Sequence, residues 1–122
     1  MQDARYELAK LELDDGNLNS AEALLKTVLK ARPEHAEANM TMGDLMMRRG
    51  KLQEAKSYLE TAVHNDPKLA AAHYKLSALF FREHDREQGE KERVLAVKLN
   101  AAANRASKTE LRLVLPESST EQ

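Results

Sequence analysis

The chain contains no cysteine and no tryptophan, and only three tyrosines and two phenylalanines stand among its 122 residues. Without cysteine, disulfide bonds and thiolate metal sites are excluded. The 19 Lys and Arg residues are balanced by 20 Asp and Glu residues, so no basic excess could neutralise nucleic-acid phosphates. No apolar run approaches the roughly 18 residues of a membrane span. We therefore expect neither nucleic-acid binding nor membrane insertion.

Proline and glycine are also scarce, with three and four copies, and most of these copies recur at one interval. Pro33 and Pro67 are 34 residues apart, and the same 34 residues separate Gly16 from Gly50. Residues of two unrelated types that share one interval indicate an internal repeat. A period of this length is typical of helical repeat proteins.

The period divides residues 1–100 into repeats at about 2–35, 36–69 and 70–100. Within each repeat, apolar residues recur at steps of three and four, which predicts two helices. Glycine suits the turn between them because it adopts the left-handed conformation that ends a helix, and proline ends the second helix. Ala21 and Ala55 are small, which lets the paired helices approach closely.

The third repeat departs from this pattern at its turn and at its end. His84 replaces the turn glycine, Gly89 replaces the small alanine, and Ala101 stands where proline ended the earlier repeats. Asp85 is predicted to begin a helix as its N-terminal cap. With no proline to stop it, that helix is expected to continue to Val114.

The helix is expected to extend beyond the repeats as a C-terminal capping extension, residues 101–115. Its apolar stripe is spaced like a heptad: Leu95, Leu99, Ala102, Ala106, Thr109 and Leu113. Two alternatives remain open, a break between Asn100 and Asn104 and a strand at residues 111–115. Residues 116–122 form a polar tail that is predicted to be disordered.

The recurring residues resemble the tetratricopeptide repeat (TPR) family. The resemblance is carried in repeat two by Met42, Gly43, Gly50, Ala55, Tyr58, Leu59, Ala62 and Pro67, and in repeat one by Leu8, Ala9, Gly16, Ala21, Leu25, Val28 and Pro33. It implies an all-α fold, a right-handed superhelical stack of antiparallel helix pairs with three repeats and the long C-terminal capping helix. It also implies a concave groove lined by the first helices, with which family members mostly bind peptides or helices of other proteins.

In this register the candidate groove residues share the exposed side of the first helices. They are Tyr6, Lys10, Leu13, Met40, Asp44, Met47, Arg48, Tyr74, Phe81 and Arg82. The large apolar residues among them form two rows at the 34-residue period, which predicts an apolar trough with a basic edge. We expect a protein–protein interaction module that binds a peptide or helix in this trough.

The alternative is a structural or self-assembly segment of a larger TPR protein that forms homodimers. The terminal helix or a second copy would then fill the trough. The chain opens within the helical pattern, which suggests a piece of a longer protein and leaves the flank of the first helix pair exposed.

Catalysis is not expected. The four histidines have no metal-ligand spacing and are interpreted as surface residues, and the chain has no glycine-rich phosphate loop. We therefore predict no enzyme activity, no cofactor and no metal. No signal or transmembrane segment assigns a compartment.

Overall fold

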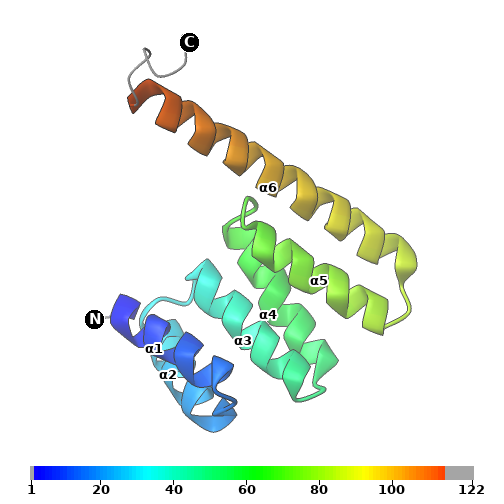
Figure 1. Cartoon of the computed structure of the whole chain (residues 1–122). Coiled ribbons are helices and arrows are strands. Elements are labelled where there is room, and N and C mark those ends of the chain that lie inside the picture. The colour runs from blue at the N-terminus through cyan, green and yellow to red at the C-terminus, as the bar shows by residue number, and fades with distance from the viewer. Residues whose placement is uncertain (1, 115–122) are drawn as a thin grey trace.

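The computed structural model describes residues 2–114, with side chains described for residues 3–108, and within this range it contains helices and no strand. The helices are α1 (Gln2–Asp14), α2 (Leu18–Ala31), α3 (Ala36–Arg48), α4 (Leu52–Asn65), α5 (Ala70–Arg82) and α6 (Arg86–Val114). They pack as three antiparallel pairs, α1 with α2, α3 with α4, and α5 with α6 (Figure 1). The all-α repeat architecture predicted from the period is confirmed.

The turn within each pair contains one residue in the left-handed conformation. Gly16 has φ 84°, Gly50 has φ 76°, and His84 has φ 64°. These residues follow the ends of α1, α3 and α5, where a positive φ turns the chain back on itself. α2 ends at Ala31 and α4 at Asn65, each two residues before a proline.

Each helix pair is held together by small residues at its closest approach. Ala21 and Ala55 are fully buried, as expected. A Cβ added to Gly43 would lie 2.7 Å from the Cγ of Leu59, which is itself fully buried. At Gly89 the added Cβ would lie 2.9 Å from the ring of Phe81. The predicted exchange of alanine for glycine in the third pair therefore makes room for an aromatic ring.

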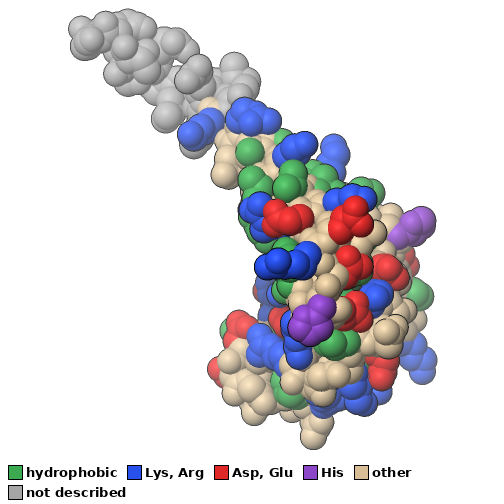
Figure 2. Space-filling view, turned by 90° about the vertical axis from the view of Figure 1, so that its right-hand side faces the viewer, with side chains coloured by type: hydrophobic (Ala, Val, Ile, Leu, Met, Phe, Trp, Pro, Cys, Tyr) green, Lys and Arg blue, Asp and Glu red, His purple; other side chains and the backbone are tan. Residues whose placement is uncertain are grey.

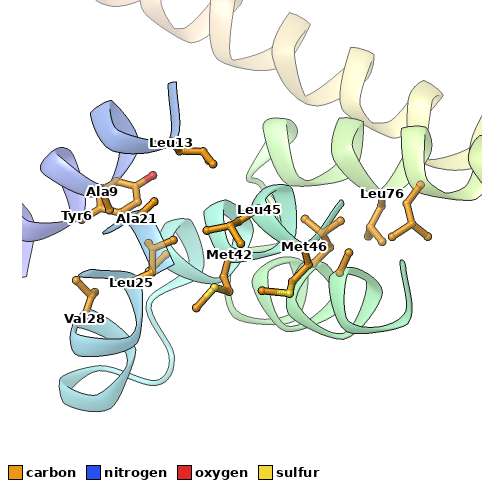
Figure 3. Close-up of a cluster of buried hydrophobic side chains, with 14 residues drawn as sticks. Tyr6, Ala9, Leu13, Ala21, Leu25, Val28, Met42, Leu45, Met46 and Leu76 are labelled. Atoms are coloured by element: carbon orange, nitrogen blue, oxygen red, sulfur yellow. The ribbon is translucent and has the colours of Figure 1, made fainter. Parts of the chain in front are cut away.

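The pairs stack in chain order through one continuous core. α3 contacts α1 and α2, and α5 contacts α3 and α4. Figure 3 shows the buried side chains that run from Val28 and Leu25 through Met42 and Leu45 to Leu76. Because each first helix touches the next, α1, α3 and α5 together form one face of the stack.

α6 begins after Asp85, whose Oδ1 accepts a hydrogen bond from the backbone N–H of Gln88 at 3.2 Å, so the predicted cap is confirmed. The helix continues without a break through Asn100 and Asn104 and projects beyond α5 (Figure 1). The projecting part does not fold back over the face formed by α1, α3 and α5, and the side chains of residues 102–108 are exposed (Figure 1).

The strand alternative for residues 111–115 is not observed, because the chain is helical to Val114. Leu115 and the predicted tail, residues 116–122, lie outside the described residues. None of the helices in the described part of the chain combines the length and apolar composition needed to cross a bilayer.

Candidate binding face of α1, α3 and α5

The predicted apolar rows are not open along their whole length. Tyr6 is only 4% exposed and Leu13 only 3% exposed, and both belong to the core. Tyr6 therefore does not line an open trough, and Leu13 contributes only a small accessible surface. The cause is the stacking of repeats, because α3 lies against α1 and covers both residues.

Contacts around Tyr6 show how α3 covers it. The Tyr6 hydroxyl lies 3.3 Å from Oγ1 of Thr41 on α3, and its ring centroid lies 5.2 Å from that of His35. Burial is the main reason why the pKa of Tyr6 is raised above its ordinary value. Tyr6 therefore acts as a packing residue between the first two repeats.

Exposure of the two rows increases toward the third repeat. Met40 and Met47 are partly buried and pack against the core. Tyr74 and Phe81 are 40% and 37% exposed, because the structure describes no further helix pair beyond α5 and α6 to cover them. The apolar side chains are therefore accessible mainly at the C-terminal end of the stack.

Charged side chains cross the face between neighbouring helices. Asp44 on α3 accepts from Nζ of Lys75 on α5 at 3.3 Å and from Nε of Arg48 at 3.4 Å. Nζ of Lys10 lies 3.3 Å from Oε1 of Glu7 and 5.1 Å from the centroid of the Tyr6 ring. The hydrogen bond to Glu7 is the main cause of the raised pKa of Lys10. The face is thus more polar than the predicted trough.

Two arginines that were expected to form an open basic edge bind backbone carbonyls instead. Nη1 of Arg48 donates to the carbonyl of Leu13 at 2.9 Å, and Nη1 of Arg82 donates to the carbonyl of Met47 at 3.1 Å. Each guanidinium therefore caps the C-terminal end of the preceding first helix, where a cation is stabilised by the helix dipole. These contacts join one repeat to the next.

A hollow of about 400 Å³ lies between α1 and α3 and reaches Lys75 on α5. Its lining combines apolar and charged side chains: Glu7, Lys10, Leu11, Leu13, Asp14, Met40, Thr41, Asp44 and Lys75. Of the ten predicted groove residues, the structure thus brings Lys10, Leu13, Met40 and Asp44 together here. The other six do not line this hollow: Tyr6, Met47, Arg48, Tyr74, Phe81 and Arg82. A depression lined by both apolar and charged side chains suits a peptide that carries both kinds of side chain.

Two of the four histidines are buried, contrary to the expectation that all lie on the surface. Nδ1 of His35 accepts from the backbone N–H of Ala38 at 3.0 Å and caps α3. The ring nitrogens of His73 lie 2.6 Å from Oε1 of Glu92 and 2.9 Å from the carbonyl of Pro67. Nδ2 of Asn39, one period before His73, donates to the carbonyl of Pro33 at 3.0 Å. Asn39 and His73 thus bind the proline-containing turns, a role that no sequence pattern indicated.

A family model described as tetratricopeptide repeat matches residues 12–80. The chain belongs to the tetratricopeptide repeat family. Members of this family generally act as protein-interaction modules, and the repeat architecture of the chain is that of a TPR scaffold. No curated protein sequence matches the chain. In the described residues, no group of three or more His, Asp or Glu side chains is placed to hold a metal ion.

Solved TPR structures are similar to this chain in fold. A MamA structure is 15% identical with a TM-score of 0.76 and covers 86% of this chain and 61% of its own. PilF of Pseudomonas aeruginosa is 19% identical with a TM-score of 0.74, covering 78% of this chain and 43% of its own. MamA from Desulfovibrio magneticus RS-1 is 25% identical with a TM-score of 0.70, covering 83% of this chain and 57% of its own. The chain thus spans about half of the length of these proteins.

Proposed function

We propose that this TPR chain is a non-catalytic module that binds a segment of another protein on the face formed by α1, α3 and α5. The observation that supports this proposal best is the hollow between α1 and α3, where Met40 lies among charged residues. Methionine adapts its shape to different apolar side chains. The charged groups would fix the orientation of the bound segment.

Binding would use one apolar side chain of the segment and charges on either side of it. The apolar side chain would enter the hollow against Met40. Lys10 would attract an acidic residue, because its pair with Glu7 is exposed, at 43% and 64%, and a carboxylate of the ligand can replace Glu7 there. Lys75 and Asp44 already form an ion pair, so they would contribute hydrogen bonds more readily than net charge.

Random 12-residue peptides displayed on phage provide a test, since no ligand has to be known. Peptides enriched on the wild-type chain are then compared on Met40→Gln and Lys10→Glu. Met40→Gln keeps the length of the side chain but makes it polar. Each substitution is expected to weaken binding about tenfold, which corresponds to the loss of one good contact.

Lys30→Glu on α2 is the matched control, because it reverses an exposed charge away from the hollow. Peptides that bind Met40→Gln and Lys10→Glu as tightly as wild type would rule out this face. Circular dichroism must show that all three variants keep the wild-type helix content.

Self-assembly is a second candidate because the N-terminal end of the stack also exposes apolar residues. Leu8 is 46% and Leu11 61% exposed, whereas Met42 and Leu45, one period later, are fully buried. A homodimer that covers this flank should dissociate in Leu11→Glu. Light scattering that gives a monomer for the wild-type chain at all concentrations would exclude this candidate.

A further inference from the structure

The C-terminal end of the stack presents a surface that the earlier repeats cover. Tyr74 and Phe81 on α5 are exposed, as are Val94 and Val97 on α6. Val63 lies one period and Leu29 two periods before Val97, and both pack against the core. We call Tyr74, Phe81, Glu87, Glu90, Val94 and Val97 the end face. Figure 2 shows hydrophobic side chains along α6 that are bordered by Lys and Arg.

Four residues of the end face have similar counterparts on the surface of α1 and α2 on which α3 docks, whereas Val94 stands where α2 has Lys26. The corresponding positions, two periods apart, are Tyr6 and Tyr74, Leu13 and Phe81, Leu29 and Val97, and Glu22 and Glu90. Two of these pairs are identical, and two exchange one apolar residue for another. The α3 helix is therefore a guide to the kind of helix that fits the end face.

The charges of α3 that contact this surface lie in its last turn. Arg48 donates to the carbonyl of Leu13, and Arg49 donates to Oε1 of Glu22 and to Oδ1 of Asn19, both at 2.6 Å. On the end face, the carbonyl of Phe81 takes the place of the Leu13 carbonyl. Glu90 takes the place of Glu22.

The acidic character of the end face is stronger than that of its counterpart on α2. Glu87 stands where α2 has Asn19. Glu22 binds Lys26 of its own helix at 3.3 Å and still accepts from Arg49. Glu90 differs, because both of its carboxylate oxygens accept from Arg93 of its own helix, at 2.8 and 2.9 Å. An incoming cation would therefore bind Glu87 and share Glu90 with Arg93, whose pair with Glu90 is exposed to solvent.

A second copy of this chain that stacks as a fourth repeat does not meet this requirement. Its α1 would bring Asp14 and Asp15 to the positions that Arg48 and Arg49 occupy in α3. Asp14 would face the carbonyl of Phe81, and Asp15 would face Glu87 and Glu90. Like charges that are brought together oppose such an association.

We propose that the end face binds an amphipathic helix of another protein whose last turn carries two consecutive basic residues. The helix would lie across α5 and α6 as α3 lies across α1 and α2. Its apolar side would cover Phe81 and Val97. Its two basic residues would bind the carbonyl of Phe81 and the carboxylates of Glu87 and Glu90. This site is separate from the hollow between α1 and α3.

A peptide of residues 35–50 of this chain is a suitable probe, because it contains the helix that makes the corresponding contacts on α1 and α2. Gly43→Ala in the peptide raises its helix propensity, and acetyl and amide groups block its ends. Binding of the fluorescent peptide to the full chain is followed by anisotropy. We expect saturable binding that weakens at least about tenfold in Val97→Glu, because a charge is then buried against the helix.

Charge reversal tests the basic last turn. The peptide with Arg48→Glu and Arg49→Glu should lose at least about tenfold in affinity for the wild-type chain. It should regain affinity for the chain with Glu87→Lys and Glu90→Lys. Lys10→Glu, which tests the hollow, should leave binding of the basic peptide unchanged.

Three results would overturn the proposal: no saturable binding up to about 1 mM peptide, equal affinity for wild type and Val97→Glu, or no effect of either charge reversal. Self-association of the chain that Val97→Glu abolishes would also overturn it, in favour of a second copy. A loss of peptide binding in Lys10→Glu alone would place the peptide in the hollow instead.

Discussion

His84 occupies the left-handed conformation that Gly16 and Gly50 adopt in the earlier turns. A side chain in this conformation costs roughly 1 kcal/mol, and glycine avoids this cost. We therefore expect His84→Gly to stabilise the chain by up to about 1 kcal/mol, measured by urea denaturation. Gly50→His is the reverse control and should destabilise. A lower stability of His84→Gly would contradict this account of the turn.

Gly43 tests the closest approach between α3 and α4. A Cβ at this position would lie 2.7 Å from Cγ of Leu59 and 3.3 Å from the carbonyl oxygen of Ala55. Neither atom can move far because both residues are fully buried. Gly43→Val should destabilise the chain by about 1–3 kcal/mol through overpacking, as read from urea denaturation.

The control for Gly43→Val places the same residue at Ser57, an exposed position of α4. Ser57→Val should change stability far less, since only helix propensity is affected. Equal losses of stability at both positions would mean that the close approach of α3 to α4 does not restrict the size of the side chain at position 43.

Residues whose role depends on the adjacent backbone or on the repeat period were predictable from sequence. Gly16, Gly50 and Asp85 act on the backbone beside them, and Ala21 and Ala55 follow from the period. His35 and His73 were missed. Their partners are a helix N–H, a proline carbonyl and a glutamate on another helix, which depend on how the turns fold back.

Between elements, the ion pair of Arg49 with Glu22 ties α3 to α2. Nη1 of Arg49 lies 2.6 Å from Oε1 of Glu22, and both side chains are 21% exposed. This hydrogen bond is the main cause of the lowered pKa of Glu22. A carboxyl group whose pKa is lowered by folding stabilises the protein above its unfolded pKa. That stabilisation is lost as the pH falls through the folded pKa.

Glu22→Gln should therefore lower stability by about 0.5–1 kcal/mol at pH 7. The deficit should begin to shrink as the pH falls below the ordinary carboxyl value of 4.5, and it should disappear once the pH is below the lowered pKa of folded Glu22, where the wild-type carboxyl is protonated as well. Urea denaturation at several pH values measures both effects. Glu60→Gln, at an exposed position of α4, should show no comparable deficit, and an equal deficit at all pH values would exclude the ion pair as its cause.

The helices themselves were predictable because apolar steps of three and four residues, glycine and proline mark them directly. α6 was expected to begin after Asp85 and to reach Val114, and it does so. Its projecting part has little packing, since the side chains of residues 102–108 are exposed. Hydrogen exchange should therefore be faster for amides of residues 102–108 than for those of residues 89–99. Equal protection along the whole helix would indicate a partner for the projecting part.

For the whole molecule, the stacking of repeats determines which surfaces remain accessible. The sequence register placed Tyr6 and Tyr74 in one exposed row, yet Tyr6 is buried by α3 and Tyr74 is not. The register of single helices gives the direction of a side chain but not whether the next repeat covers it. This is why the fold was predicted well, whereas the extent of the open apolar trough was overestimated.

The same stacking explains why the candidate hollow is partly polar. Repeat contacts use Arg48 and Arg82 to cap the preceding helices, and Asp44 to bind Lys75. Of the predicted basic edge, Lys10 lines the hollow, and its pair with Glu7 is exposed to solvent. A segment that binds here should therefore combine one apolar side chain with an acidic residue.

Chemical-shift mapping on the ¹⁵N-labelled chain shows which face binds, with a peptide enriched in the phage selection as the titrant. We expect the largest shifts on the residues around the hollow, including Lys10, Met40, Asp44 and Lys75. Shifts confined to the outer surfaces of α2 and α4 would contradict the claim that the face of α1, α3 and α5 is the binding surface.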